Sequence, residues 1–304
     1  MGTCIEAVAT AHHRGHLLGR GALHLAETAA RACLDRAHRE PDELDLLIDT
    51  GMYRDLNIAE PALAAIIQDD LGANRGSPPR IGHHGTFSFD VMNGGCGVVS
   101  SAQLADGLLA GGGARLGMVV AADADPSPRT SRHFPFAPAG GAVLLAHVPG
   151  EHGFARFAIR TYPQHAGLFE TQLVWDPRAG LARRGRNVLE VYEAPDFRAA
   201  CVARGAELVR ELLDGAGLAA GEIELLIASQ YPATFAQEIA RALGIAPDAV
   251  PAVAPELACS HSAGPIAALD AAFASGRFTS AARTLFVTCG AGLTIAAALY
   301  HRGR

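Results

Sequence analysis

Residues 43–50, Glu-Leu-Asp-Leu-Leu-Ile-Asp-Thr, recur in the second half of the chain as residues 222–229, Glu-Ile-Glu-Leu-Leu-Ile-Ala-Ser. Each copy is an apolar run of strand length that follows an amphipathic helix, predicted at residues 22–37 and 198–215. A second helix that ends in Leu-Gly follows each copy. Because the flanking elements keep the same order, we interpret the match as an internal repeat.

Each half continues with a further strand, a turn of small residues, a helix and a closing apolar strand, at residues 118–122 and 284–288. Strands that alternate with helices favour parallel sheets covered by helices on both faces. The predicted fold class is therefore α/β, with two pseudo-symmetric halves in a layered α-β-α-β-α arrangement. We assign residues 1–150 to the first half and 151–304 to the second.

Composition narrows the classes of function. The 304 residues carry a formal net charge of −6, which gives no support to nucleic-acid binding. The chain contains no lysine, so a Schiff-base lysine mechanism is excluded. No apolar run reaches the roughly 18 residues that a membrane helix needs, and no charged-then-apolar leader opens the chain. We expect a soluble, cytoplasmic protein with neither a nucleic-acid nor a membrane partner.

The cysteines and histidines do not form a metal-binding pattern. The six cysteines are scattered without a Cys-x-x-Cys pair, which is typical of free thiols. The histidine groups have no matching cysteines, so we expect no metal site. These groups are His12, His13 and His16, and His83 and His84.

The repeat brings one cysteine near a second cysteine and a histidine. Aligning the halves through Asp106 and Asp270, which hold matching places in two predicted helices, sets Cys96 opposite residues 259–261. In a pseudo-symmetric fold, the starts of these two helices should face each other. A cysteine, a histidine and a helix start would then share one site.

Cys96 directly precedes a helix predicted at residues 97–110. The unpaired amides and the dipole of a helix N-terminus favour the thiolate, which is the nucleophile. Gly94, Gly95 and Gly97 leave the turn unhindered for an acyl chain, and the same amides can bind an oxyanion. We therefore predict that Cys96 is a nucleophile; the alternative is a buried structural cysteine.

Three segments resemble the ketoacyl synthase III group of the thiolase superfamily, and they occur in that family's order. Residues 89–97, FDVMNGGCG, are similar to its nucleophile segment, and residues 136–146, FAPAGGAVLLA, to its FGDGAGAAVL strand. Residues 268–294 resemble its C-terminal end. The resemblance implies a thiolase-like fold, Cys96 as the acyl-carrying nucleophile and a homodimer. It also implies an acyl thioester substrate on phosphopantetheine, from acyl carrier protein or coenzyme A, with no further cofactor.

The sequence departs from this family at its catalytic pair. Family members use a histidine and an asparagine to polarise the malonyl thioester carbonyl during decarboxylative condensation. Family spacing places these positions at Ser229 and Cys259. His261 follows two residues later in Ser-His-Ser-Ala-Gly, which loosely resembles the GHPxG motif of thiolases, whose histidine activates the nucleophile. His261 is then either the catalytic base or a neighbour packed at the helix start.

Four more positions follow from the resemblance. Cys289 stands one residue beyond the second catalytic cysteine of thiolases, so we expect it to line the substrate pocket. The same turn should supply the second oxyanion amide, from Ala291, beside that of Cys96. Gln230 and Glu60 are candidates for substrate binding. Glu60 is included because some superfamily members bring in a glutamate from the same loop, although it can simply begin a helix at residues 61–71.

Two features concern the acyl donor. Synthase III enzymes carry a longer N-terminal stretch with a Trp and an Arg that grip the coenzyme A adenine, whereas residues 4–18 stand in that place here. A carrier-protein-bound acyl group is therefore the more natural donor. The arginine-rich run at residues 175–186 either meets an acidic carrier or a phosphate, or is a solvated loop.

Three functions remain open. The first is an acyltransferase of specialised metabolism that passes the acyl group from Cys96 to an oxygen, nitrogen or sulfur nucleophile. The second is a carbon–carbon condensing synthase in which His261 serves for the missing histidine. The third is a weakly active partner subunit of a heteromeric synthase. Retention of Cys96 with its glycines argues against the third, and loss of the two standard site residues argues for it.

Overall fold

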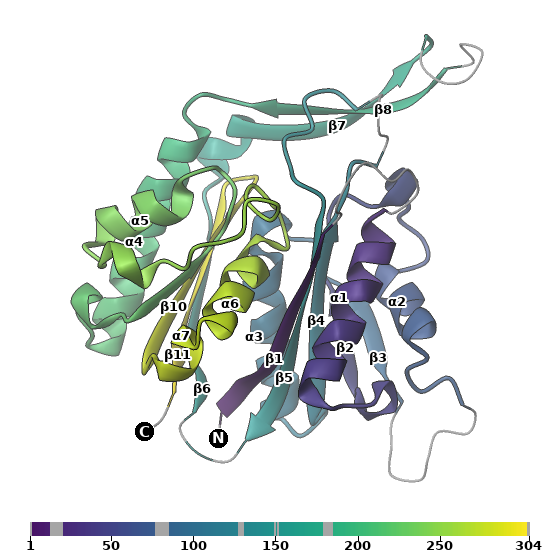
Figure 1. Ribbon diagram of the computed structural model, residues 1–304. Coiled ribbons are helices and arrows are strands. Elements are labelled where there is room, and N and C mark those ends of the chain that lie inside the picture. The colour runs from purple at the N-terminus through teal and green to yellow at the C-terminus, as the bar shows by residue number, and fades with distance from the viewer. Residues whose placement is uncertain are drawn as a thin grey trace.

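The computed structural model describes residues 2–12, 21–76, 85–126, 131–148, 150, 152–178 and 185–302. In Figure 1 these residues form five layers, with helices outside two sheets and between them. The predicted α-β-α-β-α arrangement is therefore confirmed. The proposed boundary at residue 150 falls between the last strand of one sheet and the first strand of the other, and the division into two domains stays a prediction.

The first half of the chain builds a five-stranded sheet and the two helices on its outer face. The strands are β1 (Gly2–His12), β2 (Leu46–Asp49), β3 (Phe87–Asp90), β4 (Leu116–Asp123) and β5 (Ala139–Val148), and the helices are α1 (Ala22–Ala37) and α2 (Leu63–Leu71). The strand order is β1-β5-β4-β2-β3. β2 pairs in parallel with β3 and β4, whereas β5 is antiparallel to β4 and β1. All eight residues of β4 are buried, because helices cover both faces of this central strand.

The second half repeats this plan with four strands. The elements are β6 (Gly153–Thr161), α4 (Phe197–Ala216), β9 (Leu225–Ala228), α5 (Phe235–Leu243), β10 (Arg283–Gly290) and β11 (Thr294–His301). The order β6-β11-β10-β9 has the same pairing directions as β1-β5-β4-β2. Helices α2 and α5 both end on a left-handed glycine, Gly72 and Gly244. The repeated Leu-Gly dipeptides therefore mark real helix ends.

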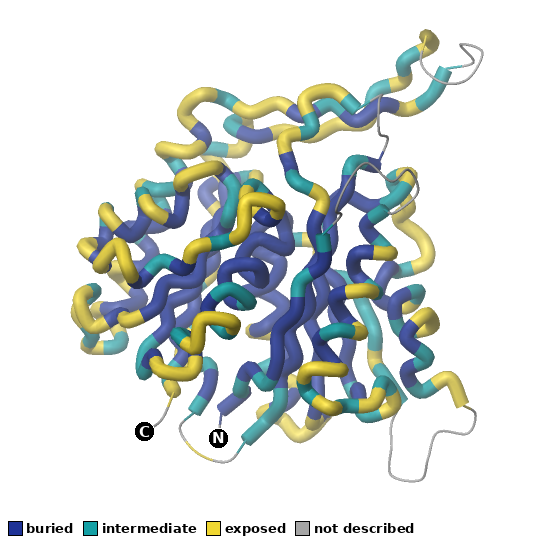
Figure 2. The backbone as a smooth tube through the Cα atoms, viewed as in Figure 1, coloured by how far each residue is buried: buried dark blue, intermediate teal, exposed yellow. Residues whose placement is uncertain are grey.

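Two helices lie between the sheets: α3 (Gly97–Ala110) and α6 (Gly264–Ala274), the latter followed by the short α7 (Arg277–Ser280). The burial view in Figure 2 shows the sheets and the central layer as the most continuously buried part of the molecule. One hydrophobic cluster joins α3 and α6 to both sheets, and two others lie under α1 and α2 and under α4 and α5. Short 3-10 turns complete the fold: η1 (Pro41–Glu43), η2 (Asp55–Asn57), η3 (Gly94–Cys96), η4 (Pro163–Leu168), η6 (Ala220–Glu222) and η7 (Pro247–Ala249).

Two predictions about strands were wrong. The sheets are mixed rather than parallel, because β10 and β11 are joined by residues 291–293 alone, which is far too short for a crossover connection. The second half also lacks its predicted third strand, since residues 250–257 contain no strand. Pro251 and Pro255 lie in this stretch, and proline cannot donate to a strand ladder.

A hairpin that the sequence did not predict projects over one end of the layers (Figure 1). It consists of β7 (Phe169–Asp176) and β8 (Arg186–Glu193), paired antiparallel. Phe169 anchors its base by ring contacts with Phe136 and Phe197. No helix of the described ranges is long and apolar enough to cross a membrane.

Candidate active site

The predicted nucleophile Cys96 ends the turn η3 and directly precedes α3. The two glycines beside it are required by close packing. A Cβ atom on Gly95 would lie 2.2 Å from the carbonyl oxygen of Cys289, and one on Gly97 would lie 2.0 Å from Oγ1 of Thr50. These positions therefore hold the turn against other parts of the protein, and do not leave open space for an acyl chain as we expected from the sequence.

The thiol of Cys96 is fully buried in this state. Its sulfur lies 3.5 Å from the carbonyl oxygen of Thr288 and 3.3 Å from that of Thr294. Burial and the neighbouring Cys289 thiol raise the pKa of Cys96 far above that of a free cysteine. Because burial raises this pKa, Cys96 is a neutral thiol that donates to a backbone carbonyl.

The turn between β10 and β11 packs against the nucleophile turn. A Cβ atom on Gly290 would lie 3.2 Å from the amide nitrogen of Gly95 and 3.5 Å from that of Cys96. A Cβ atom on Gly94 would lie 3.9 Å from the amide nitrogen of Ala291. The two predicted oxyanion donors, Cys96 and Ala291, therefore belong to facing turns. In this state the amide of Cys96 donates to the carbonyl oxygen of Asn93 at 3.0 Å, so an oxyanion would compete with that bond.

His261 lies beside these two facing turns. The position that a Cβ atom would take on Gly94 is 3.9 Å from Nε2 of His261. The ring of His261 packs against Phe136 and Tyr53, with centroid distances of 4.4 and 5.2 Å. The sequence prediction that the starts of the two central helices converge is therefore supported by the geometry. The partners of the Cys96 thiol are backbone carbonyls, so the role of His261 as a base stays a prediction.

The other nitrogen of the His261 ring, Nδ1, is 3.1 Å from Oδ2 of Asp123, the last residue of β4. The same oxygen accepts hydrogen bonds from the amide and the hydroxyl of Ser262, at 2.8 and 2.5 Å. Burial alone would raise the pKa of Asp123, but His261, the Ser262 hydroxyl and the Tyr53 amide together lower it to about 2. Asp123 is therefore a buried, ionised carboxylate.

Ser229 and Cys259 occupy the two positions where the family carries its catalytic histidine and asparagine. Ser229 follows β9, is buried, and its hydroxyl oxygen accepts a hydrogen bond of 3.1 Å from the amide of Cys289. Cys259 is partly exposed and adopts a left-handed backbone conformation with φ +63°. Its carbonyl oxygen accepts from the amide of Ala137 at 3.2 Å.

Two further predicted site residues are held by local contacts. Cys289 is buried, and its sulfur is 3.6 Å from the carbonyl oxygen of Tyr231. Burial and contact with the Cys201 thiol raise its pKa well above the usual value. Gln230 donates from Nε2 to the carbonyl oxygen of Ala228 at 3.0 Å. The predicted roles of Cys289 and Gln230 in the substrate pocket therefore stay predictions.

Several known proteins are similar to this chain. Residues 213–302 match the family model for the C-terminal part of 3-oxoacyl-[acyl-carrier-protein] synthase III. The β-ketoacyl-[acyl-carrier-protein] synthase III of Erythrobacter litoralis is 29% identical over 290 residues, which cover 90% of this chain and 82% of that protein. The enzyme of the same name from Cereibacter sphaeroides is 30% identical over 218 residues, or 70% of this chain and 62% of that protein.

A solved structure is similar over the whole fold. The synthase III of Thermus thermophilus superposes with a TM-score of 0.80 at 21% identity, covering 100% of this chain and 99% of that one. The chain is a ketoacyl synthase III-like protein of the thiolase superfamily. The resemblance noted in the sequence is thus confirmed, and so is the thiolase-like fold.

Glu60 of this synthase III-like protein is exposed, in the loop before α2. That helix begins at Leu63 rather than at Pro61, and its first amides, of Leu63 and Ala64, both donate to the carboxylate of Asp90 at 2.9 Å. Asp90 therefore caps α2, and helix capping does not explain Glu60. Its predicted role in substrate binding is untested by this geometry.

Several sequence observations lie partly or wholly outside the described residues. Arg183 and Arg184 of the arginine-rich run do so, whereas Arg178 is exposed beside the end of β7. His13, His16, His83 and His84 also lie outside them. Within the described ranges, the His, Cys, Asp and Glu side chains form no group of three or more that could hold a metal ion.

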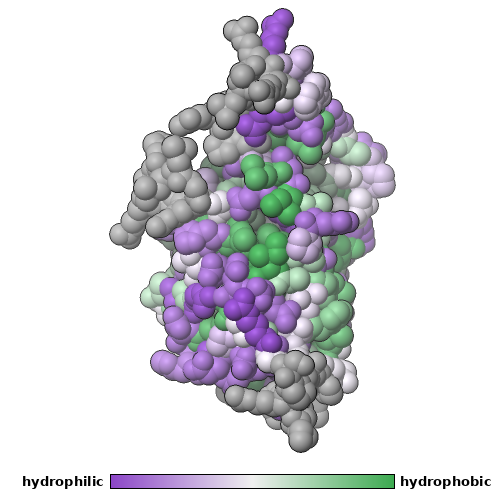
Figure 3. Space-filling view, turned by 90° about the vertical axis from the view of Figure 1, so that its right-hand side faces the viewer, coloured by the Kyte–Doolittle hydropathy of each residue, from purple (hydrophilic) through white to green (hydrophobic). Residues whose placement is uncertain are grey.

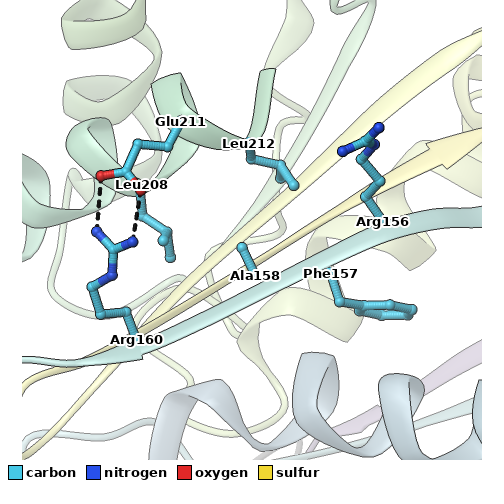
Figure 4. A pocket seen from close by; sticks show the side chains of 7 residues that line it. All are labelled: Arg156, Phe157, Ala158, Arg160, Leu208, Glu211 and Leu212. Atoms are coloured by element: carbon cyan, nitrogen blue, oxygen red, sulfur yellow. Dashed lines mark hydrogen bonds and ion pairs between the residues drawn. The ribbon is translucent and has the colours of Figure 1, made fainter. Parts of the chain in front are cut away.

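A cavity of about 300 Å³ lies between β6 and α4 (Figure 4). Arg160 and Glu211 form a two-bond ion pair on its rim, at 2.9 and 2.6 Å. None of the predicted site residues lines this cavity. It belongs to the gap between an outer helix and an edge strand, and not to the Cys96 site.

Asp123 and the aromatic side chains around His261 were missed by the sequence analysis. A signal for Asp123 was present, because one acidic residue closes the otherwise apolar run Met118-Val-Val-Ala-Ala-Asp. A charge at the end of a fully buried strand needs partners. The aromatic residues that contact the His261 ring, Tyr53 and Phe136, come from two separate loops, so no local pattern connects them.

Proposed function

We propose that this protein is an acyltransferase that takes an acyl group from a carrier-protein thioester onto Cys96 and passes it to an oxygen, nitrogen or sulfur nucleophile. Relatives named β-ketoacyl-[acyl-carrier-protein] synthase III support an enzyme of the transferase and synthase class with ketosynthase-type acyl transfer. The finer assignment rests on the departures at the site.

The observation that carries the proposal is the state of position 229. The Ser229 hydroxyl oxygen accepts a hydrogen bond from the amide of Cys289, so this side chain binds the backbone at the end of β10. Position 259 holds a thiol instead of an amide. Decarboxylative condensation needs strong donors on the thioester carbonyl to stabilise an enolate. Transfer to a heteroatom needs only a nucleophile, an oxyanion site and a base.

The transfer balances as two displacements. In the first, the Cys96 sulfur forms a bond to the acyl carbon, the bond to the carrier sulfur breaks, and the Cys96 proton passes through Nε2 of His261 to the departing carrier thiolate. In the second, His261 takes the proton of the acceptor O–H, N–H or S–H group as that atom attacks the acyl carbon. The bond to Cys96 then breaks, and the proton returns to its thiolate. The amides of Cys96 and Ala291 stabilise both tetrahedral intermediates.

The donor and the quaternary structure follow the same proposal. We expect phosphopantetheine on an acyl carrier protein as donor, with coenzyme A thioesters as the weaker alternative. We also expect a homodimer, because β3 is an edge strand that exposes Phe87, and Met92 beyond it is exposed as well. Figure 3 faces the side of the molecule on which α2 and β3 lie, and it shows apolar side chains gathered near the middle of that side.

The test is intact-mass analysis of the wild type and Cys96→Ala after incubation with acetyl, butyryl, octanoyl and malonyl thioesters of an acyl carrier protein and of coenzyme A. We expect one acyl mass on the wild type and none on Cys96→Ala. Cys4→Ala is the matched control, because it removes a more exposed thiol in β1 and should still load. If no thioester gives a Cys96-dependent mass, the transfer proposal fails and a partner-subunit role is favoured.

Condensation is the second candidate, and one observation favours it. Nε2 of His261 lies beside the turn that carries the Ala291 amide, where the protonated ring can donate from Nε2 to a thioester carbonyl. Addition of malonyl carrier protein to the loaded enzyme separates the two functions. Release of carbon dioxide with a 3-oxoacyl product supports condensation, and transfer of the acyl group to an added alcohol or amine without carbon dioxide supports the acyltransferase.

A further inference from the structure

We infer that Asp123 is the positioning residue of this site, holding the His261 ring in the one tautomer and orientation in which Nε2 can accept a proton beside the nucleophile turn. The inference rests on the proposed transfer at Cys96 and deepens it. It assigns proton handling to a pair formed between β4 and the segment before α6, instead of to positions 229 and 259.

The Asp123 carboxylate is held by donors from two other segments of the chain. Oδ1 accepts from the amides of Met52 and Tyr53, at 2.8 and 2.7 Å. Oδ2 accepts from the amide and the hydroxyl of Ser262, at 2.8 and 2.5 Å, and lies 3.1 Å from Nδ1 of His261. Asp123 is 1% exposed. A buried carboxylate with this many donors is immobile and ionised.

An ionised carboxylate can only accept hydrogen bonds. Nδ1 of His261 must therefore carry the hydrogen in the bond to Asp123. In the neutral ring this leaves Nε2 without a hydrogen, with its lone pair available. Asp123 thus selects the tautomer that a general base needs, because the alternative tautomer would place two lone pairs against each other.

The direction of Nε2 is set by packing. Phe136 and Tyr53 hold the ring from the sides at 4.4 and 5.2 Å between centroids, and His261 itself is 9% exposed. Nε2 lies 3.9 Å from the position of a Cβ atom on Gly94, and the amide nitrogen of Ala291 is equally far from that position. The free nitrogen therefore lies next to the two turns that would hold the reacting thioester.

The experiment replaces Asp123 by asparagine. On the Oδ1 side, two backbone amides can only donate, so the new carbonyl oxygen belongs there. The new NH₂ group then faces Nδ1 of His261 and the Ser262 hydroxyl, both of which can switch to accepting, and also the Ser262 amide, which can only donate. We expect His261 to change tautomer, with the hydrogen moving to Nε2. The rate of Cys96 loading should fall by about 10²–10⁴-fold, the usual contribution of a positioned general base.

Two variants serve as controls. Asp49→Asn makes the same side-chain substitution at a second buried acid, at the end of the neighbouring strand β2, where the partners are Arg54 and the amide of Gly51. Burial raises the pKa of Asp49 to about 8, so this variant controls for the substitution of a buried acid and not for the loss of a charge. It should leave the loading rate and the His261 tautomer unchanged. Ser262→Ala removes one donor to Asp123 but leaves the carboxylate in place. It should retain the wild-type tautomer and load within about tenfold of the wild-type rate.

The readouts are the loading rate with the fastest thioester of the panel, the thermal midpoint and the ¹⁵N chemical shifts of the His261 ring. The ring signals are assigned by their loss in His261→Asn. Hydrogen on Nδ1 in the wild type and on Nε2 in Asp123→Asn, together with the loss of loading, supports the inference. If Asp123→Asn keeps the hydrogen on Nδ1 or loads at the wild-type rate, Asp123 only maintains the fold. The tautomer measurement needs no substrate, so it decides the inference even where the wild type fails to load.

Discussion

The sulfur of Cys96 lies 3.3 Å from the carbonyl oxygen of Thr294, so the predicted nucleophile of this synthase III-like protein is a hydrogen-bond donor in this structure. Cys96 is fully buried, whereas Cys4 and Cys259 are partly exposed. Reactivity toward small electrophiles should follow this order.

We therefore predict that iodoacetamide modifies Cys259 and Cys4 before Cys96. Because burial raises the pKa of Cys96, its alkylation rate should keep increasing at pH values above about 8.5, where an ordinary thiol is already half ionised. Peptide mass mapping of a time course at several pH values measures both effects. Alkylation of Cys96 first, at neutral pH, would show that the thiolate is stabilised after all.

The nucleophile turn should not tolerate side chains. In Gly95→Ala the new Cβ atom would lie 2.2 Å from a backbone oxygen, so the β10 strand end or η3 must move. We expect a loss of several kcal/mol of stability, as for strained backbone and overpacked sites. Gly107→Ala, later in α3, is the control, because nothing lies within 4 Å of its Cβ position and alanine favours the helix by up to about 1 kcal/mol. Relative to the wild type, the free energy of unfolding in urea should fall for Gly95→Ala and rise for Gly107→Ala.

Asp90 should be more important for stability than its moderate burial suggests. It caps two amides of α2 and pairs with the buried Arg54 guanidinium at 2.7 Å. Asp90→Ala should cost about 2–4 kcal/mol from the lost cap and the weakened buried pair. Asp69→Ala removes an exposed pair with Arg75 and should leave the unfolding midpoint almost unchanged. Equal effects of the two variants would contradict this ranking.

Asp123 should make the fold sensitive to acid. Its folded-state pKa of about 2 is below the unfolded value of about 3.9, so its ionised form stabilises the fold by about 2–3 kcal/mol above pH 4. This contribution is lost as the pH falls from about 4 to about 2. The difference in unfolding free energy between the wild type and Asp123→Asn should therefore be constant near neutral pH and shrink across that window. A difference that does not change with pH would mean that Asp123 is not preferentially ionised in the folded state.

The exposed edge of the first sheet should be an interface. Phe87 is 62% exposed, and it lies on β3, the edge strand of this sheet. We predict that the wild type is a dimer by light scattering and that Phe87→Asp shifts it toward the monomer. Trp175 of β7 is similarly exposed, at 61%, so Trp175→Asp introduces the same charge elsewhere and should leave the dimer intact. A monomeric wild type would remove the basis for this prediction.

Local elements were predictable wherever apolar periodicity and end signals agree. Helices α1 and α3 have the predicted bounds, and the predicted helix at residues 61–71 is α2 with a later start. Two strand predictions failed because the local sequence did not match the expected pattern. Residues 250–257 had the position of a strand in the repeat, but two prolines prevent ladder formation there. The β7–β8 hairpin was missed because neither of its strands shows a regular alternation of apolar and polar residues.

By itself, the sequence determined the repeat, the layered α/β architecture and the placement of Cys96 at a helix start, since each follows from local patterns of residues along the chain. Only the tertiary structure decided the surroundings of that cysteine. Burial under two strand ends raises the pKa of a thiol that the helix N-terminus would otherwise favour as a thiolate. The partner of His261 was also decided there, because Asp123 lies 138 residues away in sequence and meets the ring only when β4 and the segment before α6 pack together.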